Sequence, residues 1–308
     1  MPQHRLGKLP PKIDKRTLQF KKYLAVGLVP PPAIVDHETL VHSWPMMLND
    51  TYGDCTIAGA GHMIQDWTAY AGTMRYPTDA QILSAYWKVS GGVGVDDGAN
   101  MLDVLNLWRQ TGIGGDTISA YVQLDVTDKV EPKNAVYLFG NLYIGISLPD
   151  YVVNVPDLLA APWELPSGQI PPPNPNNGHA VCIVGYDANY VYTVTWGSLK
   201  RMSWGFYFAY VDEAYAVLSN DWIEASGKSP EGFDVVTLQS DLTEIIGQQP
   251  PPPEPPPPPP PEPPPPPPPE PPTPPPQPPV PPGPGCVVWL PVIGAGIGVA
   301  LYELVKLI

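Results

Sequence analysis

A proline tract near the C-terminus restricts what this chain can fold into. Of the 35 residues from Pro250 to Pro284, 28 are proline. Proline has no backbone N–H donor and a fixed φ, so such a run forms neither helix nor sheet and is expected to adopt polyproline II. We therefore predict a folded domain at residues 29–249, a polyproline linker at 250–285 and a separate apolar segment at 286–308.

Charge is distributed unevenly along the chain. Residues 1–22 carry seven Lys or Arg and one Asp, whereas residues 23–249 carry 25 acidic and eight basic side chains. An acidic body repels phosphate backbones, so nucleic acid is not expected as a partner. Exposed ion pairs contribute only about 0 to 1 kcal/mol each. We therefore expect residues 1–28 to form a permanent basic strap that is held mainly by apolar side chains, namely Leu18, Phe20, Tyr23 and Leu24.

The cysteines and the N-terminus indicate the chemical setting of the chain. Cys55, Cys182 and Cys286 are too few for a disulfide framework, and no two have the short spacing of zinc ligands. The sequence therefore predicts no metal site and indicates no cofactor. The N-terminus lacks the apolar run of a secretory signal. We predict a cytoplasmic location or attachment to a membrane through the C-terminal tail.

The apolar tail has two interpretations. Its apolar run from Val287 to Tyr302 covers 16 residues, fewer than the roughly 20 that span a bilayer core. Gly294 and Gly298 form a G-x-x-x-G pattern, which favours close contact between helices. The tail is therefore either a short membrane anchor or a helix that docks on a partner protein.

Hydrophobic periodicity predicts a helical first half and a strand-rich second half, which is an α+β arrangement. Apolar spacing and glycine stops predict helices at 55–71, 79–89, 101–111 and 134–140. Runs of β-branched and aromatic residues predict strands at 142–148, 180–186, 190–196 and 204–211, with a long loop at 149–177.

Two short segments carry residues suited to nucleophilic catalysis. In NDTYGDCT, Cys55 stands at the start of a helix, where unpaired N–H groups and the helix dipole favour a thiolate. In NNGHAVCIVGYD, His179 opens a strand and would act as general base and acid beside the thiol. Cys182, by contrast, is expected to be a core residue, and His62, on a helix flank, a surface or packing residue rather than a ligand. Asp96, in a glycine loop, is explained better by turn geometry than by a cation site.

These segments resemble the papain-like cysteine peptidases, in sequence order over residues 29–217. The family's Q-G-x-C-G-S-C-W block is similar to residues 49–56, and its H-A-V-x-x-V-G-Y segment is matched by His179 to Tyr186. VTWGSLKRMSWGFY is similar to N-S-W-G followed by G-W-G-x-x-G-Y. The Cys-to-His separation of 124 residues is close to the 130 to 150 or so typical of this class. The resemblance implies a helical layer that carries Cys55, packed against an antiparallel β-rich layer that carries His179.

The resemblance also implies roles for single residues. Cys55 takes the position of the nucleophile and His179 that of the base, while the oxyanion amide falls on Asn49. Asp54 and Trp196 are expected to line the cleft. The Asn that orients the histidine aligns with Val194, which accepts no hydrogen bond, so the hydroxyl of Thr195 or Thr193 would have to replace it.

Three functions remain open at this point. The first is a papain-like thiol hydrolase that cleaves a peptide or isopeptide bond in a peptide or protein substrate. The second is an inactive papain-fold binding or structural module, displayed on the proline-rich stalk, because Val194 replaces the orienting Asn. The third is a bacterial cell-wall peptide hydrolase, because the Asp54-Cys55 pair resembles bacteriocin-processing peptidases and cell-wall endopeptidases.

Overall fold

The computed structural model describes residues 4–24, 30–222, 234, 236–237 and 240. The predicted linker at 250–285 and the apolar tail at 286–308 lie outside these residues. Within the part that is described, no helix has both the length and the apolar character needed to cross a membrane.

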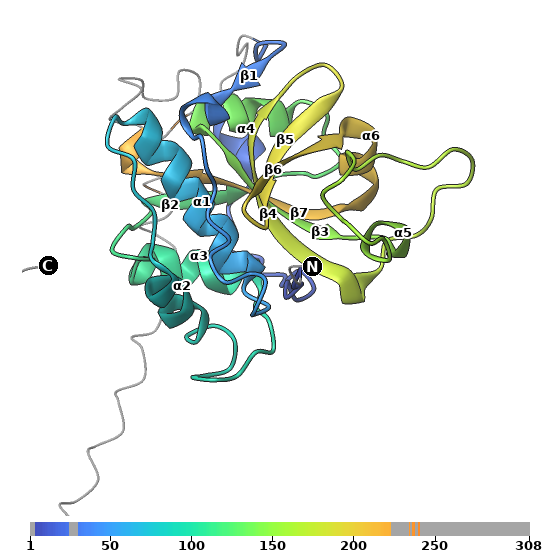
Figure 1. The fold of residues 1–308 in the computed structure, drawn as a ribbon. Helices are drawn as coiled ribbons and strands as arrows, with labels where there is room; N and C mark the ends of the chain where they lie inside the picture. The colour runs from blue at the N-terminus through green and yellow to red at the C-terminus, as the bar shows by residue number, and fades with distance from the viewer. Residues whose placement is uncertain (1–3, 25–29, 223–233, 235, 238–239, 241–308) are drawn as a thin grey trace, which may run out of the picture. The chain divides into compact units, whose positions relative to one another are not determined.

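An antiparallel sheet forms the centre of the fold (Figure 1). Its strands are ordered β2-β7-β3-β4-β5-β6, and the short β1 pairs with β4. Every pair of neighbours is antiparallel. The strands are β1 (Val35–Asp36), β2 (Ala120–Gln123), β3 (Leu142–Ser147), β4 (Gly178–Tyr186), β5 (Tyr190–Thr195), β6 (Ser198–Ser203) and β7 (Val211–Leu218).

Helices cover the sheet, with α1 lying across it in Figure 1 and α2 and α3 beside α1. Three short 3-10 turns, η1 (Phe20–Tyr23), η2 (His37–Leu40) and η3 (Pro175–Asn177), lie in the connections. The helices are α1 (Cys55–Tyr70), α2 (Asp79–Tyr86), α3 (Met101–Gln110), α4 (Glu131–Phe139), α5 (Asp150–Val153) and α6 (Trp204–Tyr210).

The central strands separate two hydrophobic cores. Along β4, Val181 and Ile183 enter one core, whereas Cys182 and Val184 enter the core shared with α1, α2 and α3. This alternation follows from the period of two in a strand, which sends neighbouring side chains to opposite faces. The predicted α+β arrangement is confirmed.

The strand predicted at 204–211 is wrong, because residues Trp204–Tyr210 form helix α6. The Ser203 hydroxyl accepts a hydrogen bond from the Phe206 N–H and caps this helix, while Phe206 and Tyr210 are buried. Capping and burial of these aromatic rings override the strand preference of aromatic residues. Strands β1, β2, β6 and β7 were not predicted.

Close packing positions the start of α1 against the sheet. Gly59 has no side chain, and a Cβ there would lie 3.2 Å from the Tyr143 ring and 3.6 Å from the Ala180 carbonyl oxygen. The small residues at the start of α1 therefore let its backbone approach β4. Cys55, one turn earlier on α1, is brought to the same strand.

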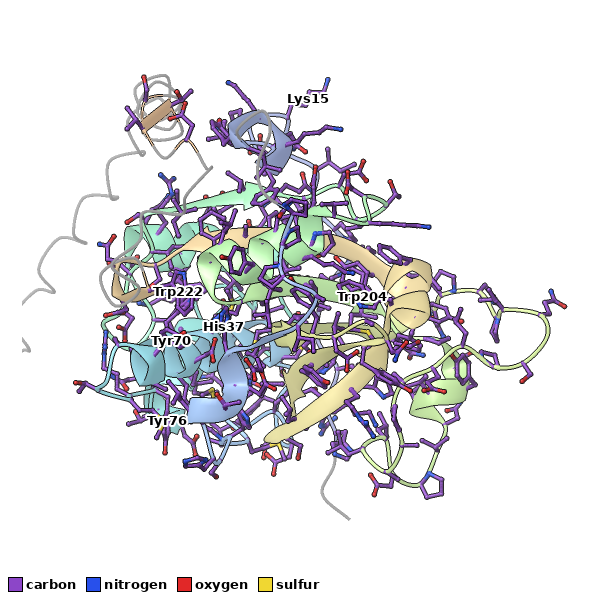
Figure 2. The ribbon with its side chains drawn as sticks, turned by 90° about the horizontal axis from the view of Figure 1, so that it is seen from above. Lys15, His37, Tyr70, Tyr76, Trp204 and Trp222 are labelled. Carbon is purple, nitrogen blue, oxygen red and sulfur yellow. The ribbon has the colours of Figure 1, made fainter. Side chains whose placement is uncertain are left out.

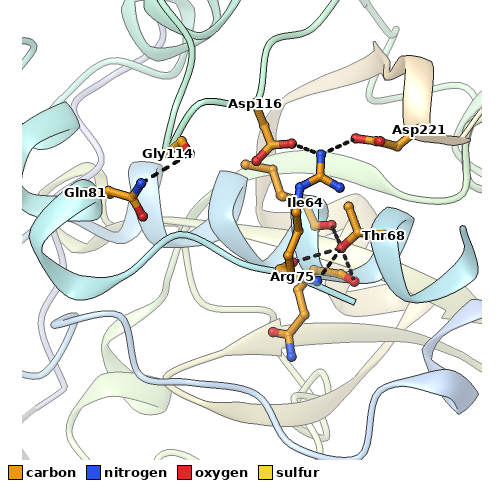
Figure 3. A network of polar contacts seen from close by, with 8 residues as sticks. Ile64, Thr68, Arg75, Gln81, Gly114, Asp116 and Asp221 are labelled. Carbon is orange, nitrogen blue, oxygen red and sulfur yellow. Dashed lines mark hydrogen bonds and ion pairs between the residues drawn. The ribbon is translucent and has the colours of Figure 1, made fainter. Parts of the chain in front are cut away.

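The far end of α1 is held by polar contacts and by aromatic rings. Arg75 pairs with Asp116 and, at 3.1 Å, with Asp221, while its N–H donates to the Thr68 hydroxyl at the end of α1 (Figure 3). The rings of His37, Tyr70 and Trp222 form one cluster (Figure 2). The centroids of His37 and Tyr70 each lie 4.7 Å from that of Trp222, and they lie 5.5 Å from each other. These contacts fix the direction in which α1 presents Cys55.

The N-terminal arm packs on the domain. Phe20 and Tyr23 are buried in the core on the α4 side, and Leu18 and Leu24 pack against it. The apolar contacts expected of a strap are therefore present. Earlier in the arm, however, the side chain of Lys8 is fully buried and forms two ion pairs. The sequence did not predict this buried charged contact in the arm.

Candidate active site

Cys55 is the first residue of α1 and is 1% exposed. Burial raises the pKa of its thiol to about 11, and hydrogen-bonding contacts from the main chain of Ala180 and Gly7 only partly oppose this shift. Ala180 follows His179 on β4, so the thiol lies next to the strand position of the predicted base. The helix start alone does not stabilise a thiolate while the site is closed to water.

His179 is 1% exposed and is held by two neighbours. Its Nε2 lies 2.6 Å from the Thr195 hydroxyl, and its ring stacks on Trp196 with centroids 4.2 Å apart and planes 14° apart. Nδ1 is buried and has no hydrogen-bond partner among the described residues. One ring nitrogen is therefore fixed by a hydroxyl, while the other remains available for proton transfer.

Burial lowers the pKa of His179 to about 3, and a smaller effect in the same direction comes from the charge on His4. Together with the raised pKa of Cys55, this favours a neutral thiol and a neutral imidazole. The closed structure therefore does not hold the thiolate-imidazolium pair that the sequence predicts for an active thiol.

The hydroxyl beside His179 belongs to Thr195, at the end of β5. Thr193 donates instead to the Cys182 carbonyl oxygen at 2.8 Å, so its hydroxyl does not reach the histidine. Val194, which aligns with the orienting Asn of the family, pairs with Cys182 and is buried in the core shared with α1. The group that contacts the imidazole therefore comes one position after the aligned residue.

Trp196 and Gly197 form the turn between β5 and β6, with φ of 45° and 68°. Positive φ at both central residues is the geometry of a type I′ hairpin, which glycine accepts and tryptophan adopts at a cost. This turn holds the Trp196 ring against His179. A stacked ring shields the His179–Thr195 contact from water.

Asn49 and Asp54 lie on the loop that leads to Cys55, and both are buried. The Asn49 amide donates to the Tyr52 carbonyl oxygen at 3.2 Å and to the Arg5 carbonyl oxygen at 3.4 Å. Burial raises the pKa of Asp54 to about 8, and the Asn49 side chain opposes this shift. Asp54 is therefore mostly protonated at neutral pH.

Residues 4–9, here called the covering segment, pass over the predicted site. Arg5 N–H donates to the Asn49 carbonyl oxygen at 3.0 Å, and the Arg5 carbonyl oxygen accepts from Trp196 Nε1 at 3.1 Å. Gly7 N–H and Lys8 N–H both donate to the Gly178 carbonyl oxygen, at 3.2 and 3.1 Å. The chain's own N-terminal segment thus contacts the surroundings of Cys55 and His179, which explains their burial.

Solved structures share this arrangement of elements. Xylellain, a cysteine protease from Xylella fastidiosa, aligns at a TM-score of 0.57 and 16% identity, covering 71% of this chain and 98% of that chain. This chain has a papain-like fold. Procathepsin L 3 from the larval midgut of Tenebrio molitor aligns at 0.48 and 16% identity, covering 68% of this chain and 75% of its own. No protein-family profile and no curated protein matches the sequence.

In this papain-like fold, two further residues support the loop before Cys55. Asp96 accepts hydrogen bonds from Gly53 N–H at 2.8 Å and from the Tyr86 hydroxyl at 2.6 Å, and that hydroxyl accepts from Gly98 N–H. Sequence analysis treated Asp96 as a turn residue and missed this contact. An acidic side chain in a glycine-rich loop was the available signal.

Proposed function

We propose that the chain is a thiol hydrolase that cleaves peptide bonds, with Cys55 as nucleophile and His179 as base and acid. One observation carries this proposal: His179 Nε2 is held 2.6 Å from the Thr195 hydroxyl while its buried Nδ1 has no hydrogen-bond partner among the described residues. An imidazole fixed at one nitrogen and free at the other, on the strand that contacts the thiol, is suited to proton transfer.

The proposed reaction needs only groups of the chain and water. His179 Nδ1 takes the proton of the Cys55 thiol, and the sulfur attacks the peptide carbonyl carbon. The Asn49 amide and the Cys55 N–H would donate to the oxyanion. The imidazolium then protonates the leaving amine as the C–N bond breaks. Water, deprotonated by the same imidazole, hydrolyses the thioester, which releases the carboxylic acid and restores the thiol.

The covering segment supports a peptide as the ligand. It is an extended piece of polypeptide whose N–H groups donate to Gly178 and whose Arg5 carbonyl oxygen accepts from the Asn49 amide. A substrate chain would find the same main-chain partners when the covering segment leaves.

The first test uses the full chain with Gly7→Ala. A Cβ at Gly7 would overlap the Gly53 carbonyl group, so the substitution is expected to displace the covering segment. An epoxide thiol trap should then label Cys55 stoichiometrically and faster than Cys182. Adding His179→Ala should slow the labelling of Cys55 by roughly a hundredfold or more, because general-base catalysis is lost. Equally slow labelling of Cys55 and Cys182 in the Gly7→Ala protein would refute the catalytic role.

The second prediction concerns the histidine's partner. In the Gly7→Ala background, Thr195→Val should lower the rate of peptide hydrolysis about tenfold or more, because His179 loses the hydrogen bond that orients it. Thr195→Ser keeps the hydroxyl and should retain most of the rate. Thr193→Val, whose hydroxyl bonds Cys182 instead, is the matched control. Equal losses for Thr195→Val and Thr193→Val would indicate a packing effect.

A binding module remains the second candidate, and the closed site favours it. Cys55 is buried with a raised pKa, and main-chain hydrogen bonds hold the covering segment over it. If the chain only binds peptides, Cys55→Ala should leave peptide affinity and every biological role unchanged. A role that is lost in Cys55→Ala while peptide affinity is retained would exclude this candidate.

A further inference from the structure

Lys8 places an ammonium group in an enclosed acidic site. Its side chain is 0% exposed, and Nζ lies 2.9 Å from Asp212 Oδ1 and 3.1 Å from Glu213 Oε1. The Lys8 Nζ also donates to the Leu9 carbonyl oxygen at 3.3 Å. We call Met101, Gly145, Asp212 and Glu213 the lysine site.

A break in strand register brings both carboxylates to one side. Gly145 pairs with Glu213, but Ile146 pairs with Val211, so Asp212 is the extra residue of a β-bulge. In a regular strand, neighbouring side chains face opposite sides, and a bulge is the feature that allows two consecutive residues to face the same way. Both side chains contact Nζ as a result.

Neighbouring groups shape the lysine site for an alkyl chain that ends in a cation. A Cβ at Gly145 would collide with Lys8 Cε and lie 2.8 Å from Met101 Sδ, so a glycine is required beside the stem. Ser147 donates to Asp212 at 2.7 Å, and Tyr215 donates to Glu213 at 3.0 Å. These bonds leave the remaining carboxylate oxygens directed at the ammonium group.

The lysine site lies next to the predicted nucleophile. Gly7, the residue before Lys8, contacts the Cys55 thiol through its main chain. On the other side, the Ala99 N–H donates to the Gly7 carbonyl oxygen at 2.8 Å, and Leu9 N–H donates to the Ala99 carbonyl oxygen at 3.0 Å. An extended peptide bound by these main-chain groups would place one side chain in the lysine site.

We propose that the lysine site selects peptides that carry a lysine side chain, and that Lys8 occupies it until such a peptide replaces the covering segment. The proposal rests on the proposed function only in taking a peptide chain as the ligand of the Cys55 site. The net negative body at residues 23–249 would also attract basic peptides. The buried carboxylate of Glu213 and the partly buried one of Asp212 would disfavour an acidic or apolar side chain, because they would remain unpaired.

The experiment measures peptide binding without requiring hydrolysis. Two full-length variants vacate the site differently: Gly7→Ala by steric displacement, and Lys8→Met by loss of the charge. Two peptides are compared: an acetylated peptide with the sequence of residues 6–10, and the same peptide with norleucine in place of its lysine. For each peptide, we measure the concentration that protects Cys55 from alkylation by iodoacetamide. Mapping of alkylated peptides separates Cys55 from Cys182 and Cys286. Thermal unfolding of each variant verifies that it is folded. One folded variant is enough for the comparison of the two peptides.

The lysine peptide should protect Cys55 at a concentration about tenfold or more lower than the norleucine peptide does, because it alone pairs with the buried Glu213 and the partly buried Asp212. In Gly7→Ala with Asp212→Asn and Glu213→Gln, the two peptides should protect equally. Equal protection by both peptides while the two carboxylates are intact would overturn the proposal. Lysine-dependent protection without any cleavage would support the lysine site and contradict the proposed hydrolase. Cleavage without a preference for lysine would support the hydrolase and contradict the lysine site.

Discussion

Alkylation of Cys55 in the intact chain is expected to rise about tenfold per pH unit from about pH 6 to 10 with no plateau, because only the thiolate reacts. Burial beneath the covering segment raises the pKa of this thiol to about 11. At neutral pH the thiolate is therefore a very small fraction of the total. The measurement is the rate of iodoacetamide modification of Cys55 by peptide mapping.

Displacing the covering segment should change both the rate of Cys55 alkylation and the way in which that rate depends on pH. In Gly7→Ala, Cys55 gains contact with water, and its pKa should fall toward or below the ordinary value of about 8.5. The rate at neutral pH should rise at least about a hundredfold, and a plateau should appear by about pH 9. An additional low-pH limb would indicate that His179 holds the thiolate as an ion pair.

Cys182 is the internal control for this experiment. It is buried on β4, its pKa is also raised by burial, and the main-chain hydrogen bonds of the covering segment go to Asn49, Gly178 and Ala99 instead. Its modification should remain slow in Gly7→Ala. If Cys55 and Cys182 accelerate together, the variant has loosened the whole domain. If neither changes, the covering segment does not control access to the thiol.

Local sequence patterns predict the two central residues of the candidate site. Cys55 precedes a run of small residues with helical spacing, and His179 opens a buried apolar run, so each signal lies within about ten residues of its site. The same local patterns failed at α6, where the Ser203 cap and the burial of Phe206 decide the structure. Strand β6 was missed because Leu199 and Arg201 are exposed and its apolar content is low.

The contacts that complete the site depend on long-range placement. Thr195 reaches His179 because the turn at Trp196 and Gly197 sets the end of β5, and alignment by motif points to Val194 instead. Lys8 and Asp212 are 204 residues apart in sequence. No periodicity or capping signal relates two such positions, so the burial of Lys8 could not be predicted.

Asp54→Asn is expected to stabilise the domain above neutral pH. Burial raises the pKa of Asp54 from its ordinary 3.8 to about 8. Because the folded pKa lies above the unfolded one, the folded state binds the proton more tightly. The free energy of unfolding therefore falls as pH rises from about 4 to 8, and it does not change further above that range. Asparagine has a similar shape and carries no charge, so this loss should disappear.

The expected gain at pH 8 is on the order of 5 kcal/mol, and it should shrink toward zero near pH 4. Urea unfolding at several pH values measures it. Asp97→Asn, at an exposed position of the glycine loop, is the control and should change the free energy of unfolding by no more than about 0.5 kcal/mol. A gain for Asp54→Asn that is independent of pH would mean that ionisation of Asp54 is not its cause.

Two buried histidines are expected to lower the free energy of unfolding at acidic pH, which is the opposite pH dependence to that of Asp54. This difference makes the test of Asp54 more specific. Burial lowers the pKa of His62 to about 4 and that of His179 to about 3. A folded pKa below the ordinary 6.5 means that stability is lost as pH falls through 6.5 toward 4, because the unfolded chain then binds the protons. Between about pH 4 and 6.5 the Asp54 and histidine effects have opposite signs and partly cancel, so Asp54→Asn should steepen the acid limb there and flatten the decline in stability between about pH 6.5 and 8. A variant that shifted both limbs equally would have altered packing around α1 rather than removed a titrating carboxyl group.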